Sequence, residues 1–123
     1  MSERGGIWRE DHCLWPRARL ARDPLSRAVG LLGRRGLADD EALWLRPCSA
    51  VHMWGMRIAI DIVWLDGTGR ILGLRAGLRP WQYAWPRVRG VRDTIELAAG
   101  AIERWQLLSG QRLEWRSAGS GVL

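Results

Sequence analysis

The first half of the chain has a helical pattern of apolar residues, beginning after Asp23 and Pro24. Asp is a good N-cap, and Pro suits the first helical position because its missing N–H would have no partner there. Apolar residues then recur at helical spacing: Leu25, Ala28, Val29 and Leu32. Gly36 follows the Arg34–Arg35 pair, which places cations at the end where the helix dipole is negative. We therefore predict one amphipathic helix from Pro24 to about Gly36.

Beyond Gly36 the apolar residues alternate with a period of two, which is typical of strands. In Ile58–Leu65 both faces are mostly apolar, which predicts a central strand buried on both sides. The next four residues, Asp66–Gly69, form a turn, because glycine takes positive φ and Asp can bond its own backbone. Further strands are predicted at Ala42–Leu45, Arg70–Leu74, Thr94–Leu97 and Leu113–Trp115, with a short helical piece at Ala101–Leu107.

This order of elements indicates a mainly β domain, α+β by content. It is a small β-sandwich or an open β-barrel, with the helix of the N-terminal half packed on one side. The length of 123 residues is that of a single domain covering residues 1–123. We expect its core to span about residues 20–115, with irregular ends at residues 1–15 and 117–123.

Composition excludes several classes of protein. Charged residues make up 26% and apolar residues 47%, the mix of a globular protein rather than a disordered one. No apolar run approaches the ~18–20 residues that a membrane span needs. The chain is basic, with a formal net charge of +6, and all nineteen basic residues are arginine. Lys, Asn and Phe are absent while Trp occurs nine times, a bias that indicates a GC-rich genome. Because the arginines are spread along the chain, we do not expect a nucleic-acid partner.

The N-terminus and the cysteines bear on the compartment. No apolar segment of ~7–15 residues follows the start, so we expect no secretory signal and a cytoplasmic protein, with export by another route as the alternative. The two cysteines, Cys13 and Cys48, lie 35 residues apart without a C-x-x-C motif. We expect buried or half-buried thiols in a reducing compartment, and a Cys13–Cys48 disulfide if the protein is exported.

The segment before and inside the predicted central strand concentrates polar chemistry. His52, Arg57 and Asp61 lie within ten residues of one another. A buried carboxylate must be paired, because an unpaired buried charge costs several kcal/mol. Either Arg57 or His52 could be the partner of Asp61. One interpretation makes His52 a general base oriented by Asp61, and the other, which we favour, makes Asp61 a structural carboxylate. No nucleophile in a G-x-S-x-G turn accompanies the pair.

Metal ligation is a further possibility. His12, Cys13, Cys48 and His52 supply four nitrogen and sulfur ligands in number. Adjacent His12 and Cys13 cannot easily reach one ion, so we expect no metal site and no cofactor. The two methionines of this region, Met53 and Met56, are typical core residues.

Aromatic side chains cluster between Pro80 and Pro86. Trp81, Tyr83 and Trp85 could form a stacking platform for a sugar or a base. The alternative is that they cover one end of the barrel, because in a chain without Phe the tryptophans must do ordinary packing. We favour packing, and keep Trp81 and Trp85 as candidate ligand-binding residues.

Three landmarks in order resemble a known family. They are Arg27–Arg34, with the pattern RAVGLLGR; Val51–Arg70, which runs from Val-His into Ile-Asp-Ile-Val-Trp-Leu-Asp; and Ile95–Gly100, with Ile-Glu-Leu-Ala-Ala-Gly. Their order and spacing are similar to the bacterial and archaeal family called domain of unknown function 192, over about Leu20 to Trp115. The resemblance implies a compact, mostly β domain with one helix and carries no established activity. Many relatives have an export leader.

The resemblance also assigns places to individual residues. It puts His52, Met56, Asp61, Asp66 and Glu96 at the polar and sulfur landmarks of the family. It puts Trp44, Trp54 and Trp64 where relatives have Phe or another bulky apolar residue, which implies core positions. The usual Met of the helix motif is replaced by Leu32, a change that conserves volume.

Three functions are therefore open. The first, which we favour, is a non-catalytic accessory module that binds a small ligand or a protein partner near His52, Met56, Arg57, Asp61, Trp81 and Trp85. A concave pocket lacking these residues would count against it. The second is a small hydrolase or lyase using His52 and Asp61, which needs both side chains within ~3 Å of each other and open to solvent. The third is an arginine-driven nucleic-acid binder, which needs its arginines on one face.

Overall fold

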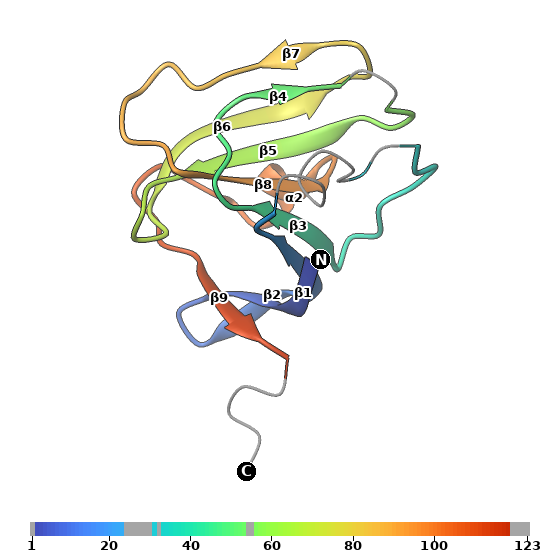
Figure 1. Ribbon diagram of the computed structural model, residues 1–123. Coiled ribbons are helices and arrows are strands. Elements are labelled where there is room, and N and C mark those ends of the chain that lie inside the picture. Colours follow the sequence, from blue (N-terminus) through green and yellow to red (C-terminus); the bar gives the residue numbers. More distant parts are fainter. Residues whose placement is uncertain (1, 24–30, 32, 54–55, 119–123) are drawn as a thin grey trace.

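The computed structural model describes residues 2–23, 31, 33–53 and 56–118, with only the backbone of His52. Seven strands form one sheet in the order β6-β5-β8-β3-β2-β1-β9, and β4 and β7 form a separate two-stranded ribbon (Figure 1). All strand pairs are antiparallel except β2 with β3. The elements are β1 (Ser2–Arg9), β2 (His12–Ala21), β3 (Glu41–Leu45), β4 (Val51–His52), β5 (Ile60–Leu65), β6 (Ile71–Leu78), β7 (Tyr83–Ala84), β8 (Asp93–Ala98), α2 (Ala101–Arg104) and β9 (Glu114–Ser117).

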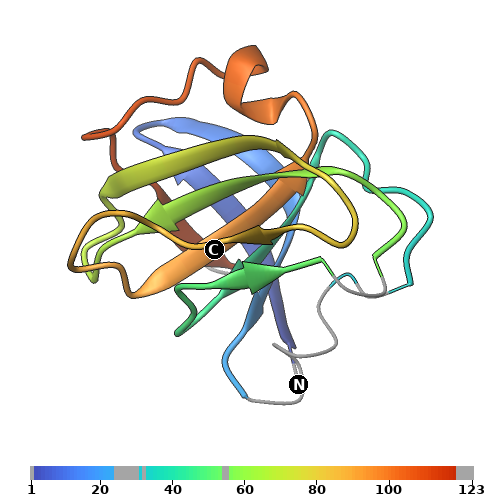
Figure 2. The ribbon, with the colours of Figure 1, turned by 90° about the horizontal axis from the view of Figure 1, so that it is seen from above.

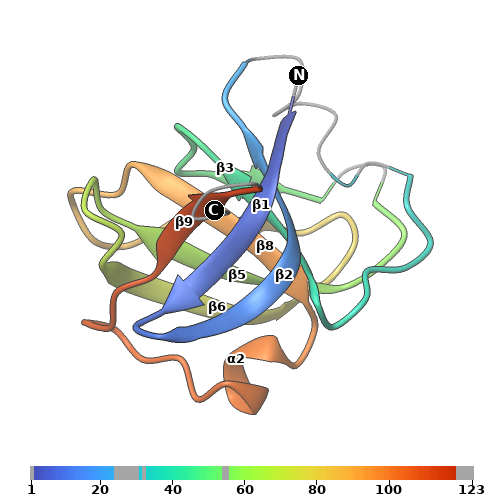
Figure 3. The same cartoon turned by 90° about the horizontal axis from the view of Figure 1, so that it is seen from below.

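The sheet curls until its two edge strands approach each other, so the fold is an open barrel (Figure 3). An isolated bridge joins Arg70 to Arg112, and the N–H of Leu113 donates to the carbonyl of Gly69 over 2.9 Å. Gly69 has φ +87°, and a Cβ there would lie 2.3 Å from the Leu113 carbonyl oxygen. Only glycine permits this close approach of the two edges.

Two apolar layers lie on opposite faces of the sheet. The inner layer fills the barrel and includes Trp15 and Trp44, both almost fully buried. The outer layer lies between the β6-β5-β8-β3 side and the segments that cross it, among them the β4–β7 ribbon seen from above in Figure 2. Residues of β4 and β7, Val51 and Ala84, belong to this outer layer together with Met53. Half of the sheet is therefore covered on both faces, which explains why β5 is buried at every residue.

Several predicted elements are confirmed with small changes of boundary. The mainly β class, the open barrel, and strands near 42–45, 60–65, 71–78, 93–98 and 114–117 are all present, as is the short helix after Gly100. The strand β5 is buried at every residue as predicted, but it is second from one edge, and β3 holds the middle position. The predicted helix from Pro24 to Gly36 falls largely on residues that lie outside the described ones.

The predicted irregular start was wrong. Residues 2–21 form the long β1–β2 hairpin, and Ile7, Leu14 and Trp15 belong to the inner core. Irregular register between Gly5 and Trp8 breaks the alternation that a simple pattern search needs. In the hairpin turn, the position with positive φ (56°) is occupied by Glu10. The turn therefore lacks the glycine that commonly marks a tight hairpin in a sequence.

Candidate functional site

Asp61 is enclosed in the structure and bound by backbone donors. Its side chain accepts hydrogen bonds from the N–H of Gly77 at 2.9 Å, of Gly100 at 3.1 Å and of Ile102 at 2.9 Å. The residue is 1% exposed. The carboxylate thus ties β5 to β6 and to the start of α2, which lie 16 and about 40 positions further along the chain. A carboxylate that accepts several backbone N–H bonds is stabilised where it stands without a counter-ion.

These contacts favour the structural interpretation of Asp61 over the acid–base one. The carboxylate is not open to solvent, and its partners within the described part of the chain are backbone N–H groups rather than Arg57. His52 pairs its backbone with Tyr83 across the ribbon, and its side chain lies outside the described part of the molecule. The neighbouring Arg57 is exposed, and Met56 is buried in the outer apolar layer. Of the residues predicted together in this stretch of sequence, Met56 and Asp61 are therefore in the core and Arg57 is at the surface.

Three aromatic side chains stand out from the ribbon in the structure. Trp81 is 67% exposed, Tyr83 52% and Trp85 63%, whereas Ala84 between them is buried. Tyr83 and Trp85 are alternate residues of an extended segment and so point to the same side, and Trp81 lies in the turn just before them with φ 69°. These three exposed residues are here called the aromatic row. The backbone of the row is fixed, because Trp81 N–H donates to the carbonyl of Met53 and Met53 N–H to that of Gln82. The prediction that these residues pack over the barrel end does not hold for their side chains.

The segment that contains the aromatic row is rich in arginine. Between Arg46 and Arg92 the chain has eight arginines and two acidic residues, so this segment holds the entire formal net charge of +6. Its described ion pairs both end on the buried carboxylate of Asp93, which binds Arg46 and Arg92. Of the other six, all exposed, Arg70 lies near the carboxylate of Asp66, and five have no carboxylate partner among the described residues: Arg57, Arg75, Arg79, Arg87 and Arg89.

This asymmetry was missed at the level of sequence. The arginines are spread along the chain, as noted, but the acidic residues are not, and outside residues 46–92 the two charges balance. The strands of this segment, β4 to β7, occupy the upper end of the molecule in Figure 1, and β1, β2 and β9 the lower end. Counting carboxylates in a window, rather than arginines alone, would have found the basic end.

The sheet interior contains two more carboxyl groups. Asp93 accepts a hydrogen bond from Nε1 of Trp44 at 3.0 Å and from Nε of Arg46 at 3.0 Å. Glu96 lies on β8 and has no hydrogen-bond partner within the part of the chain that the structure describes. Burial raises the pKa of Glu96 to about 7, because the charged form loses its hydration.

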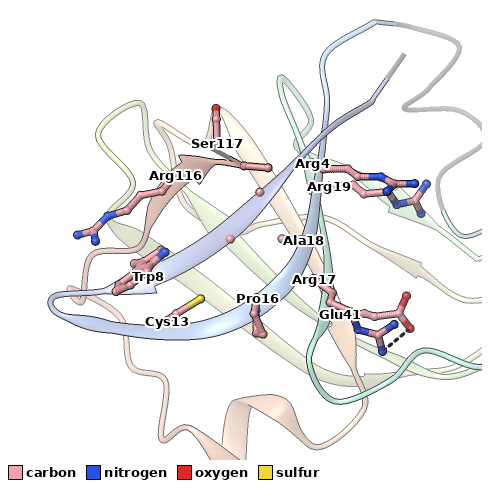
Figure 4. A pocket seen from close by; sticks show the side chains of 13 residues that line it. Arg4, Trp8, Cys13, Pro16, Arg17, Ala18, Arg19, Glu41, Arg116 and Ser117 are labelled. Atoms are coloured by element: carbon pink, nitrogen blue, oxygen red, sulfur yellow. Dashed lines mark ion pairs between the residues drawn. The ribbon is translucent and has the colours of Figure 1, made fainter. Parts of the chain in front are cut away.

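A groove lies at the lower end of the molecule, on the outer surface of β1, β2 and β9 (Figure 4). Its volume is about 850 Å³, within the range of small-molecule sites. None of the ligand-binding residues predicted from sequence lines it, which counts against a small-ligand pocket formed by those residues. The half-buried Cys13 is in its wall, and Cys13 and Cys48 are not joined to each other. Burial raises the pKa of the Cys13 thiol, because its charged form loses hydration. Within the described residues, His, Cys, Asp and Glu side chains form no group of three that could hold a metal ion.

Sequence comparison then assigns the chain to a family. A model of the family DUF192, described as "Uncharacterized ACR, COG1430", matches residues 7–115. The chain belongs to the DUF192 family. A relative in Pyrococcus furiosus, a UPF0127 protein, is 32% identical over 100 residues, covering 79% of this chain and 84% of the relative. A UPF0127 protein of Thermococcus sibiricus is 28% identical over 67 residues, covering 54% of this chain and 42% of that protein.

Two solved structures share the DUF192 fold seen here. A protein of unknown function from Novosphingobium aromaticivorans has a TM-score of 0.75 at 24% identity, over 85% of this chain and 76% of that one. A protein from Sinorhizobium meliloti, described as a candidate transcription regulator, has a TM-score of 0.76 at 26% identity, over 94% of each chain. No helix among the described residues is long and apolar enough to cross a membrane.

Proposed function

We propose that this protein is a non-catalytic binding module that holds an extended anionic partner on the aromatic row. The observation that carries this proposal is the exposure of Trp81, Tyr83 and Trp85 on a fixed ribbon at the basic end of the molecule. Large exposed apolar groups that a fold does not need for packing mark interaction sites. Trp, Tyr and Arg are also the residues that contribute most to binding energy at interfaces.

The exposure of the row favours an extended partner over a small ligand. Small-molecule sites enclose most of the ligand surface, whereas each side chain of the row is more than half exposed. A row of rings on an open surface can instead contact successive units of a chain. The anionic character of the partner follows from the five exposed arginines without carboxylate partners.

Single-stranded nucleic acid is the partner class that this combination favours. Proteins that bind single strands without sequence preference stack bases on aromatic side chains and contact phosphates with arginine. The aromatic row and its arginines supply both kinds of group. The description of the Sinorhizobium meliloti neighbour as a candidate transcription regulator is consistent with a nucleic-acid ligand.

A fluorescently labelled oligothymidylate, followed by anisotropy at low and moderate salt, tests the proposal. We expect binding that weakens steeply with salt, because phosphate contacts release counter-ions. The double variant Trp81→Ala/Trp85→Ala should lose about tenfold or more in affinity for each tryptophan, since stacking contributes ~1–3 kcal/mol per base. Both side chains are exposed, so the variant should keep the stability of the parent protein.

Two controls make the outcome decisive. Arg104→Gln removes an arginine outside the basic segment, one that is paired with Asp39, and should leave the affinity unchanged. The second control is an oligoglutamate peptide of equal charge, which tests whether an anionic chain without bases binds as well. Binding of the peptide with the same dependence on Trp81 and Trp85 would replace nucleic acid by an acidic protein partner. Absence of oligothymidylate binding, or binding that is indifferent to both tryptophans, would overturn the proposed function.

A further inference from the structure

The groove on β1, β2 and β9 has a pair of arginines that face each other across two strands. Arg4 on β1 lies directly opposite Arg19 on β2 in the antiparallel ladder, and both line the groove. Figure 4 shows their guanidinium groups together at one end of it. Like charges on directly opposite residues destabilise an antiparallel pair. The fold thus keeps two cations at close range that no feature of the strand pairing requires.

Neither arginine has a carboxylate partner among the described residues. The other cations of the groove are engaged: Arg17 makes two hydrogen bonds of 2.8 Å to Asp40, and Arg116 binds Glu114 at 2.8 Å and lies over the ring of Trp8. The acidic residue of the lining, Glu41, is bound by Arg34 at 3.1 Å. Arg4 and Arg19 are therefore the groove's unneutralised pair.

The floor beside this pair is made by residues with no more than a methyl group. Gly5, Gly6 and Ala18 line the groove between the two strands. At Gly5 a Cβ would lie 2.4 Å from the carbonyl oxygen of Arg116, so the approach of β9 requires glycine there. The floor of the groove is therefore largely backbone, and the rings of Trp8 and Pro16 complete the lining.

We propose that this groove is a second binding site, which takes a small molecule carrying an oxyanion, a carboxylate or a phosphate, between Arg4 and Arg19. The guanidinium group presents planar donors that match the paired oxygens of both anions. An anion placed between the two arginines would turn their repulsion into two attractive contacts. The body of the molecule would then lie over Gly5 and Gly6. This site is independent of the aromatic row, which is at the other end of the molecule.

Thermal unfolding at constant ionic strength tests the site, with chloride replaced stepwise by inorganic phosphate or by acetate. The two probes distinguish a phosphate ligand from a carboxylate ligand. We expect one of them to raise Tm saturably, by about 5 °C at ten times its dissociation constant. Arg4→Gln and Arg19→Gln should each abolish this rise. In chloride alone each variant should unfold at the Tm of the parent protein or above it, because the substitution relieves repulsion.

Arg112→Gln is the matched control, since it removes an exposed arginine that belongs to neither proposed site and should retain the full anion response. If the anion raised the Tm of Arg19→Gln as much as that of the parent protein, the rise would be a general salt effect, and the proposal would be overturned. A lower Tm of Arg4→Gln and Arg19→Gln in chloride would also overturn it, because it would mean that the two arginines stabilise the fold themselves. Absence of oligothymidylate binding would not change the response of Tm to phosphate or acetate. The two proposals can therefore fail separately.

Discussion

The two faces of the sheet each bury an acidic side chain. One of these carboxyl groups is held by hydrogen-bond donors, and the other has none among the described residues. Asp61 on β5 is opposite Leu97 and points into the inner layer, whereas Glu96 on the neighbouring β8 is opposite Ile62 and points into the outer layer. Both residues are buried. Asp61 receives three backbone N–H donors, while Glu96 has no hydrogen-bond donor within the described residues.

The difference shows that burial alone does not identify a functional carboxylate. Near the start of β5 the ladder with β6 has an irregular register around Gly77, and the chain turns at Gly100 before α2; both places leave N–H groups that a strand ladder does not use. Asp61 accepts hydrogen bonds from three such groups, and no cation binds it within the described residues. Glu96 lies in mid-strand, where the neighbouring backbone groups are already paired with β3 and β5. A buried acidic side chain therefore stabilises the fold at Asp61, and its charged form destabilises the fold at Glu96.

The largest expected effect is the loss of the Asp61 carboxylate. Asp61→Ala should lower the free energy of unfolding by about 4 kcal/mol, because the N–H groups of Gly77, Gly100 and Ile102 would be left without their acceptor. Urea unfolding followed by tryptophan fluorescence measures the change. A loss below about 1 kcal/mol would mean that water replaces the carboxylate, and that Asp61 does not hold β6 and α2 to β5.

Glu96→Gln should have the next largest effect, with the opposite sign at high pH. The pKa of Glu96 is raised from 4.5 to about 7, so its contribution to stability is fully present below pH 4.5 and is lost as pH rises through about 7. At pH 8 the variant should be more stable than the parent protein by about 3 kcal/mol, because ~1.4 kcal/mol accompanies each pKa unit.

Urea unfolding of both proteins between pH 5 and pH 8 checks this prediction. The difference between variant and parent should shrink steadily toward pH 5, since Glu96 is then protonated in the folded protein. Parallel profiles across this range would show that the carboxyl group of Glu96 is hydrated or paired in the folded protein.

Asp66→Ala should have the smallest effect and is the matched control for Asp61. Asp66 also accepts three hydrogen bonds, from Thr68 N–H at 2.8 Å, Thr68 Oγ1 at 2.7 Å and Arg70 N–H at 3.0 Å. The turn around it is exposed, so water can replace the lost acceptor, and we expect a loss of about 1 kcal/mol in the same urea experiment. A loss equal to that of Asp61→Ala would show that burial does not decide the cost.

Asp66 should also show the opposite pH dependence to Glu96. The hydroxyl of Thr68, donating to the carboxylate, and the N–H groups of Thr68 and Arg70 hold the pKa of Asp66 below its ordinary value of 3.8. Its contribution is therefore present above about pH 4 and is lost as pH falls below that value. The difference between Asp66→Ala and the parent protein should narrow in acid, where the difference for Glu96→Gln also disappears.

The elements that could be predicted from sequence are those with an unbroken local pattern. The apolar alternation of residues 58–65, the turn at Asp66–Gly69 and the helix after Gly100 all appear in the structure. The β1–β2 hairpin was missed because its irregular register and its Glu10 turn carry no regular signal. The expectation that Asp61 is buried and anchored was right, but its donors come from β6 and from the start of α2.

By itself the sequence determined the β class, the buried character of β5 and the composition of the basic end, because these depend on neighbours in the chain or on simple counts. Only the tertiary structure decided which donors reach Asp61, which side chains of the aromatic row remain exposed, and that Arg4 faces Arg19. These relations join residues that are far apart in sequence. They depend on strand order and register, which arise from the packing of the whole sheet and leave no local periodicity to read.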